Sequence, residues 1–274
     1  MEPRETTLPD TNRWWRFVLS PRFSHRFPWL VLVAGLVIRV SDPPAYHTLV
    51  ESEFGFIENA TVALLAVMVI ATIVAFRKRQ FVPARWFGPF AIMLLLGAIY
   101  FGGEESSWGQ HWFGWETPES LAALNAQDET NLHNTSSWFN EKPRIILELS
   151  ILTGLIWAVA RDRRRRGAAD PTDDLYWLLP GKECYSVALA TVLVQYPERL
   201  GKLLPELTGA SAWNFRLAEY QEFFFAVYLL TYMCSILRRI DQQEQKKKQQ
   251  REESDQHVLP FASATDAQQI RLVA

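Results

Sequence analysis

Apolar residues in this chain are gathered into long blocks, and they do not recur at the three- and four-residue spacing of a half-buried helix. A helix needs about 20 mainly apolar residues to cross a hydrocarbon core of about 30 Å. The pattern therefore predicts an all-α, polytopic membrane protein with about six transmembrane helices. The predicted spans are Pro28 to Val40, Ile57 to Phe76, Trp86 to Gly102, Arg144 to Ala160, Glu183 to Tyr196 and Tyr220 to Leu237.

The first of these blocks is the shortest, and it crosses a bilayer only if its helix begins near Pro21. Arg22 and Arg26 would then extend their charged ends to the lipid headgroups. We therefore begin the predicted transmembrane domain at residue 21.

Lysine and arginine predict the orientation of the spans, because these residues are retained in the cytoplasm when they lie near helix ends. Of the 28 basic residues, 21 precede the first span, follow the second or the fourth, or follow the sixth. This alternation predicts six crossings with both termini in the cytoplasm. The expected location is the inner (cytoplasmic) membrane of a bacterium.

The predicted topology divides the chain into three parts. Residues 1–20 form a cytoplasmic N-terminal segment, and residues 21–239 form the transmembrane domain. Within that domain, residues 103–143 form a polar insert, which we expect to lie on the outer side as a short helical or loop cap. Residues 240–274 are rich in Gln, Glu and Lys, a composition that predicts a disordered cytoplasmic tail.

Composition limits the classes of partner. The formal net charge is only -2, so the overall charge gives no indication of nucleic-acid binding, and the expected partner is the lipid bilayer. The two cysteines, Cys184 and Cys234, lie in apolar stretches and have neither metal-site spacing nor a disulfide framework. We expect both to be buried thiols.

The polar insert holds the candidate chemistry, because it is dense in carboxylates, amides, tryptophans and histidines. If residues 104–115 are helical, Glu104, Trp108, His111 and Trp115 share one stripe of that helix. Thr117 and Pro118 predict the cap and the first residue of a second short helix over residues 118–126.

An ionisable side chain in or near a membrane span is costly enough to need a partner or a function. The candidate catalytic residues are the carboxylates and imidazoles of the insert: Glu104, Glu105, His111, Glu129 and His133. The residues expected to support them come from the insert and from neighbouring helix ends: Glu58, Gln110, Asn131, Asn134 and Glu148.

Three interpretations of these residues stay open. Glu105, His111 and His133 could bind a divalent metal such as zinc, although the chain has no HExxH motif. A Glu/His pair could instead perform acid–base chemistry without a metal, since burial raises the pKa of a carboxyl group. In the third interpretation the polar residues only clamp the insert onto the bundle, and Arg144 and Glu148, four apart on one helix, form a local ion pair.

Three stretches carry a resemblance to known proteins: ESEFGFIEN at 51–59, EESSWGQ at 104–110 and NAQDETNLHN at 125–134. They resemble a family of bacterial multi-pass membrane proteins with the patterns EExSWGQ and NxQxExNLHN, and this resemblance implies no particular reaction. The chain is more distantly similar to the alkaline-ceramidase-like membrane hydrolases, which hold zinc with histidines inside a helical bundle. It lacks their paired-histidine helix and has one fewer predicted span.

The leading functional hypothesis is a membrane-embedded hydrolase or transferase that opens outward and acts on an amphiphilic or lipid-linked substrate. The first alternative is a cation- or proton-coupled transporter, which predicts carboxylates at several depths, whereas these are gathered at one end of the spans. The second alternative is a structural or assembly subunit that uses the insert as its docking surface.

Overall fold

A computed structural model describes residues 14–52, 55–123, 129–132, 135–165, 170–203 and 215–271. These residues form helices and connecting turns, without a β-strand among them, as the sequence predicts. The α-helices are α1 (Trp15–Val18), α2 (Phe27–Ser41), α3 (Pro43–Tyr46), α4 (Phe56–Arg77), α5 (Phe87–Glu105), α6 (Gln110–Phe113), α7 (Glu119–Ala122), α8 (Ser137–Arg165), α9 (Asp174–Leu178), α10 (Tyr185–Leu193), α11 (Tyr196–Leu203) and α13 (Leu217–Arg271). The π-helices are η1 (Arg22–Arg26) and η2 (His47–Glu51), and the 3-10 helices are η3 (Arg79–Phe81), η4 (Ser107–Gly109) and η5 (Lys182–Cys184).

Within the described residues, five helical segments are long and apolar enough to cross a membrane. They are Arg22–Ser41, Pro43–Arg77, Phe87–Glu105, Glu141–Arg164 and Leu217–Asp255. Each overlaps one predicted span, and the first begins at Arg22, close to the expected Pro21. These five segments identify the chain as a membrane protein by length and composition.

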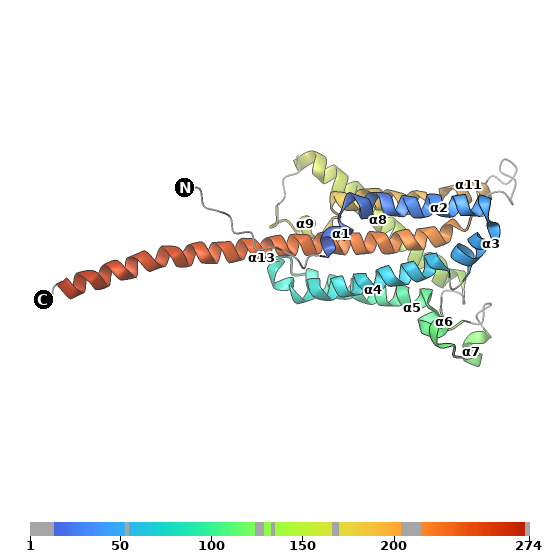
Figure 1. The fold of residues 1–274 in the computed structure, drawn as a ribbon, viewed down its shortest axis with the longest axis horizontal. Coiled ribbons are helices and arrows are strands. Elements are labelled where there is room, and N and C mark those ends of the chain that lie inside the picture. The colour runs from blue at the N-terminus through green and yellow to red at the C-terminus, as the bar shows by residue number, and fades with distance from the viewer. Residues whose placement is uncertain are drawn as a thin grey trace.

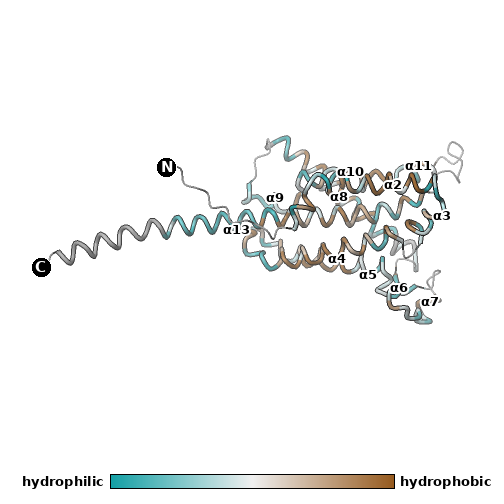
Figure 2. The backbone as a smooth tube through the Cα atoms, viewed as in Figure 1, coloured by the Kyte–Doolittle hydropathy of each residue, from teal (hydrophilic) through white to brown (hydrophobic). Residues whose placement is uncertain are grey.

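The remaining predicted span, Glu183 to Tyr196, is not one continuous helix. It is divided between α10, of nine residues, and α11, of eight. Pro197 explains the break, because it has no N–H to donate to the carbonyl of Leu193 one turn earlier. The two short helices follow one another along the bundle beside α2 (Figure 2).

Helix α13 is the centre of the bundle. It lies between α4 and α5 on one side and α2, α8 and α11 on the other (Figure 1). In its most apolar stretch 94% of the residues are buried within the protein, compared with 17–33% in the other four segments. The last helix of the chain is therefore the one on which the others pack, while the other four leave most of their apolar surface for lipid.

The C-terminal region differs from the prediction. The sequence predicts a disordered tail from residue 240, but α13 continues as a helix to Arg271. Gln, Glu and Lys are good helix formers, and Glu244 pairs with Lys248 one turn later at 2.8 Å. Lys78 binds Asp241 and Glu244 at 2.8 Å each, so the helix is held where it leaves the apolar bundle.

The insert also differs from the prediction, because residues 104–115 are not one helix. Helix α5 ends at Glu105, and Ser107, Trp108 and Gly109 then adopt positive φ angles of 45°, 56° and 99°. The predicted stripe of Glu104, Trp108, His111 and Trp115 is therefore not formed. Gly109 is suited to this turn because it has no Cβ.

The second helix of the insert is shorter than expected. Helix α7 covers Glu119–Ala122 only, and residues 124–126 of the predicted helix lie outside the described residues. Pro118 occupies the N-cap position, and the hydroxyl of Thr117 accepts a hydrogen bond from Gln110 at 2.9 Å. Helices α6 and α7 lie at the end of the bundle opposite the projecting part of α13 (Figure 1).

Candidate functional site

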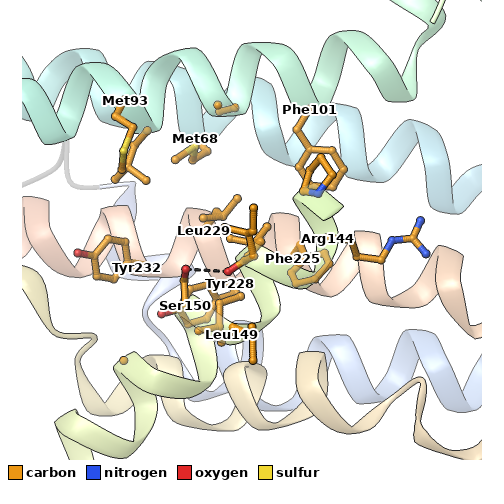
Figure 3. Close-up of a pocket in the computed structure, with 18 of the residues that line it drawn as sticks. Met68, Met93, Phe101, Arg144, Leu149, Ser150, Phe225, Tyr228, Leu229 and Tyr232 are labelled. Atoms are coloured by element: carbon orange, nitrogen blue, oxygen red, sulfur yellow. Dashed lines mark hydrogen bonds between the residues drawn. The ribbon is translucent and has the colours of Figure 1, made fainter. Parts of the chain in front are cut away.

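A cavity of about 1060 Å³ runs along the bundle between α5 and α8, with residues of α13 forming its floor (Figure 3). We call it the α5–α8 groove. Most of its length is apolar, with Met93 and Phe101 from α5, Leu149 from α8 and Phe225 from α13 among the lining residues. The sequence did not predict this groove.

Small residues on the two facing helices leave the space for the groove. Gly97 and Ala98 line it from α5, and Ser150, Thr153 and Gly154 line it from α8. A Cβ atom placed on Gly97 would meet no other heavy atom within 4 Å. Small residues usually let membrane helices approach closely, but here they border an open cavity.

One end of the groove is charged. Glu104 and Glu105 reach it from the end of α5, Arg144 from α8 and Glu222 from α13. Arg144 donates a hydrogen bond to the Glu222 carboxylate, which ties α8 to α13 at this end. In Figure 3, Arg144 lies at one end of the groove and Tyr232 near the other.

Glu105 is the carboxylate that this arrangement leaves directed to the groove. It lies within electrostatic range of Glu222, Glu219 and Glu58, and of the Arg144 guanidinium. Within the described part of the chain, its side chain makes no hydrogen bond and no ion pair. Glu105 of α5 and Glu222 of α13 thus line the same end of the groove, and Glu58 of α4, also from the predicted set, lies within electrostatic range of Glu105.

Glu104 immediately precedes Glu105 in the chain but has a different, structural role. Its carboxylate is buried and accepts hydrogen bonds from Trp108 Nε1 at 2.9 Å and from the backbone N–H of Leu132 at 2.7 Å. Glu104 therefore fastens the two halves of the insert to the end of α5.

Three other predicted residues hold the insert together in the same way. The side chain of Gln110 donates to Thr117 and accepts from the Thr130 backbone N–H at 2.6 Å. Asn131 donates to Ser107 Oγ at 3.0 Å and also to the Glu129 carboxylate. For Glu104, Gln110, Glu129 and Asn131, the contacts match the clamping interpretation.

The predicted local ion pair between Arg144 and Glu148 is wrong. Glu148 is buried and accepts two hydrogen bonds from Arg199, at 3.0 and 2.7 Å, and one from Gln221 at 3.3 Å. Arg144 is paired with Glu222. Each partner comes from another helix, and the Arg199–Glu148 contact is bidentate, which is a stronger geometry than a single contact.

Of the proposed metal ligands, His133 and the side chain of His111 lie outside the described part of the structure. The predicted supporting residue Asn134 also lies outside it. Among the side chains that are described, no three from His, Cys, Asp and Glu are arranged as ligands for a metal ion. The zinc site of Glu105, His111 and His133 therefore stays a prediction.

Sequence reasoning missed three parts of this site: Arg144 and Glu222 as groove residues, and the groove itself. Two signals were available. Glu219 and Glu222 are three residues apart at the start of the sixth predicted span, so they share a helix face. Small residues also recur within the third and fourth spans, at Gly97–Ala98 and at Ser150–Gly154.

The chemistry of the groove has to be inferred from its shape and charge. Comparison of the chain with protein-family models, with curated proteins and with solved structures found no match. The groove combines a long apolar wall with carboxylates and a guanidinium at one end. That is the arrangement expected for a molecule with an apolar tail and a polar head.

Proposed function

We propose that this chain is a hydrolase or transferase of the bacterial inner membrane that takes an amphiphilic or lipid-linked molecule into the α5–α8 groove and reacts at its headgroup. The observation that carries this proposal is the groove, which is apolar along its length and charged at one end. With both termini cytoplasmic, as the basic residues predict, the charged end lies on the outer side of the membrane.

The dimensions of the groove support a lipid tail as its occupant. From Phe90 to Glu105, α5 extends about 22 Å at 1.5 Å per residue. One leaflet of hydrocarbon is about 15 Å thick, half of the core of about 30 Å. The groove is therefore long enough to hold an acyl or isoprenoid chain while its head remains beside Glu105.

The wall of the groove also supports entry from the bilayer. Met93, Ile146 and Leu149 line the groove, and their exposed fractions are 58%, 65% and 56%. Apolar residues this exposed on a membrane helix face lipid. A tail can accordingly enter sideways between α5 and α8 without crossing an aqueous layer.

Glu105 is the residue that we assign as general base. It would take a proton from a water molecule, whose oxygen then attacks the atom joining headgroup and tail. The bond to the leaving group breaks, and the leaving group receives the proton back from Glu105, so one water is added across one bond. If an alcohol replaces water, the same step is a transfer. Arg144 would stabilise negative charge that develops on the attacked group.

Gly97→Phe tests whether the groove binds a tail. The new ring fills the groove, whereas the matched control Leu96→Phe enlarges a neighbouring side chain that lies outside it. Purified protein in lipid nanodiscs is labelled with a photoactivatable palmitate probe. We expect wild type and Leu96→Phe to be labelled on α5, α8 or α13, and Gly97→Phe to fall to background. Equal labelling of Gly97→Phe and Leu96→Phe would refute the proposal.

Glu105→Gln tests the chemistry separately. Proteoliposomes are loaded with an alkyne-tagged bacterial lipid extract, and the tagged products are identified by mass spectrometry. Loss of a general base lowers a rate by about 10²–10⁴-fold, so we expect a product of the wild type to be absent from Glu105→Gln. Suppose that wild type and Glu105→Gln form the same products and that Glu105→Gln is still labelled by the palmitate probe. The groove then binds the tail, but Glu105 is not the general base.

The insert gives some support to a second candidate, a docking or assembly role. Trp112 and Phe113 are 54% and 78% exposed, and Phe113 stacks on Trp115 with ring centroids 6.0 Å apart. Aromatic rings at this level also anchor a protein in lipid headgroups. Replacing Trp112 and Phe113 by serine, with a pull-down from membranes, would favour docking only if a specific partner were lost.

A further inference from the structure

We infer that the α5–α8 groove selects its ligand by the length of the tail, and that the tail it fits best is an unbranched alkyl chain of about 16 carbons. This inference rests on the proposed function, because it assumes that the groove holds the tail. It goes further by assigning the length of that tail and the residues that set it.

The groove has a polar limit at one end. Arg144 of α8 and Glu222 of α13 line it there and are bonded to each other. An alkyl chain can form no hydrogen bond with either group, so it gains nothing by displacing one from the other. The tail therefore begins on the apolar side of this pair, and the head lies beside it.

The opposite end of the groove is closed by the connection between α9 and η5. Leu178, Leu179 and Pro180 of this connection line the groove, and the last two are buried. Two hydrogen bonds from α13 hold the connection in place. Tyr232 Oη donates to the carbonyl of Leu178 at 2.7 Å, and Arg239 donates to the carbonyl of Leu179 at 3.0 Å. A longer tail would have to break these bonds to move the connection.

Helix α8 approaches the connection at this closed end. Gly154 and Trp157 line the groove and, being three residues apart, share one face of the helix. A Cβ atom placed on Gly154 would lie 3.6 Å from Pro180 Cδ, which is an ordinary contact distance. Trp157 lies almost one turn beyond Gly154 and is the lining residue of α8 farthest from Arg144 along the helix. These two residues therefore border the last part of the groove.

The distance between the two ends sets the length of the tail. From Arg144 to Trp157, α8 advances about 20 Å at about 1.5 Å per residue. Carbon–carbon bonds of about 1.5 Å at an angle of about 111° advance an extended chain by about 1.25 Å per carbon. The quotient is about 16 carbons.

The preference for this length comes from packing. A tail that moves from lipid into the groove exchanges one apolar surrounding for another, so hydrophobicity contributes little to the choice between tails. A shorter chain leaves the closed end unfilled and loses dispersion contacts there. A longer chain has to fold back or leave through the open side of the groove. Binding should therefore be strongest when the chain just reaches the closed end.

The test is competition against the photoactivatable palmitate probe in nanodiscs, using straight-chain alcohols that share one head: decanol, hexadecanol and docosanol. Longer alcohols enter the bilayer more completely, so each is compared by its measured mole fraction in the nanodisc lipid. We expect hexadecanol to compete at a mole fraction at least about tenfold lower than decanol, which is about 1.4 kcal/mol, and about threefold lower than docosanol. Equal competition by all three, or strongest competition by docosanol, would overturn the inference.

Two substitutions on α8 should shift the preferred length in opposite directions. Gly154→Leu fills the closed end, so decanol should gain on hexadecanol. Trp157→Ala opens that end by about one helical turn, so docosanol should gain on hexadecanol. Ala160→Leu enlarges an exposed position of α8 outside the groove and should leave the order of the alcohols unchanged.

These variants separate length selection from a general defect. A loosened bundle would weaken all three alcohols alike, whereas a change in the length of the groove alters their order. If Gly154→Leu does not fold, Trp157→Ala still decides, because Trp157 is 56% exposed and its loss should cost little stability. An order that Trp157→Ala leaves unchanged would refute the assignment of the closed end.

The two proposals fail in different ways. If Gly97→Phe is labelled as strongly as Leu96→Phe, the groove does not hold the tail and the proposed function is lost. If labelling depends on Gly97 but the three alcohols compete alike, the groove still binds a tail and only the selection by length is refuted.

Discussion

Neighbouring residues can have unrelated tasks when a helix ends between a membrane and a polar cap. Glu104 and Glu105 are adjacent at the end of α5, and successive side chains on a helix do not face the same way. The carboxylate of Glu104 binds Trp108 and Leu132 of the insert, and that of Glu105 is directed to the groove among other carboxylates. The first is a structural residue and the second is the one proposed to meet the ligand.

Replacing Glu104 by alanine should release the insert. Both hydrogen bonds involve a charged carboxylate, so their loss is expected to destabilise the protein by about 2–4 kcal/mol. The measurement is the unfolding midpoint in mixed micelles, together with the rate of protease cleavage between residues 106 and 132. Glu119→Ala is the control. Unchanged cleavage in Glu104→Ala would show that the insert is held by other contacts.

Gly35 is a second position where one atom decides the packing. A Cβ atom there would lie 1.7 Å from Tyr220 Oη and 2.8 Å from Tyr220 Cζ. Gly35→Ala should therefore cost about 1–3 kcal/mol by overpacking. Adding Tyr220→Phe should restore part of the loss, because the closest atom is removed, and a double-mutant cycle of unfolding midpoints measures this coupling.

The matched control for that cycle is Gly97→Ala. It makes the same chemical change inside a membrane helix, but the added Cβ meets no heavy atom within 4 Å. Gly97→Ala should leave stability unchanged or raise it slightly, since alanine is the better helix former. If Gly35→Ala were as harmless as Gly97→Ala, the packing of α2 against α13 at Tyr220 would have to differ from the structure.

At the scale of elements, the divided segment α10–α11 lacks the continuous backbone hydrogen bonds of a single helix, and side-chain hydrogen bonds stabilise it around the break. Arg199 of α11 binds Glu148 of α8 with two hydrogen bonds and also contacts Gln195 at 2.9 Å. Gln221 of α13 donates to both Glu148 and the carbonyl of Thr191, at 3.3 and 3.0 Å. Four helices around the break, α8, α10, α11 and α13, are thus connected by one polar network.

Arg199→Met should loosen this network. It leaves the Glu148 carboxylate buried without its bidentate partner, and since Arg199 itself is partly exposed we expect a loss of about 2 kcal/mol. Arg199→Lys should lose less, because a lysine keeps the charge but cannot form the two parallel bonds. The unfolding midpoints of the two variants test this order, and equal midpoints would show that charge alone matters at this position.

At the scale of the whole molecule, the two ends of the bundle differ in character. At one end, Trp15 and Lys78 both contact Asp241, where α13 leaves the bundle. At the other end lie α6 and α7 of the insert (Figure 1). The predicted topology places the first end in the cytoplasm and the second outside.

Reporter fusions test that orientation. Green fluorescent protein fused after residues 82, 165 or 271 should fluoresce, because these positions are predicted to be cytoplasmic. Alkaline phosphatase fused after residue 120 should be active, because it is expected to be exported. Inactive alkaline phosphatase at residue 120 would place the insert on the side of the arginine cluster at residues 163–166 and would refute the outward-facing site.

The apolar blocks could be found from sequence because length and hydropathy alone define a span. The break before Pro197 was not predicted, because the apolar block from Glu183 to Tyr196 was interpreted as one span, although a missing N–H is a local property. Ion pairs could not be predicted, because their partners come from distant helices: Arg144 pairs with Glu222, and Glu183 pairs with Arg238 at 2.6 Å although Lys182 is its neighbour. The groove could not be predicted for the same reason, because it depends on the distance between helices and not on the sequence of any single helix.

The central place of α13 has a consequence for how the protein is made. Ribosomes release the chain from its N-terminus, so α2, α4, α5 and α8 enter the bilayer before the helix on which they pack has been synthesised. The groove, whose floor belongs to α13, cannot exist until translation is almost complete. A chain truncated before Leu217 would thus be inserted and yet have no binding site, and quality-control proteases would meet a loose set of helices.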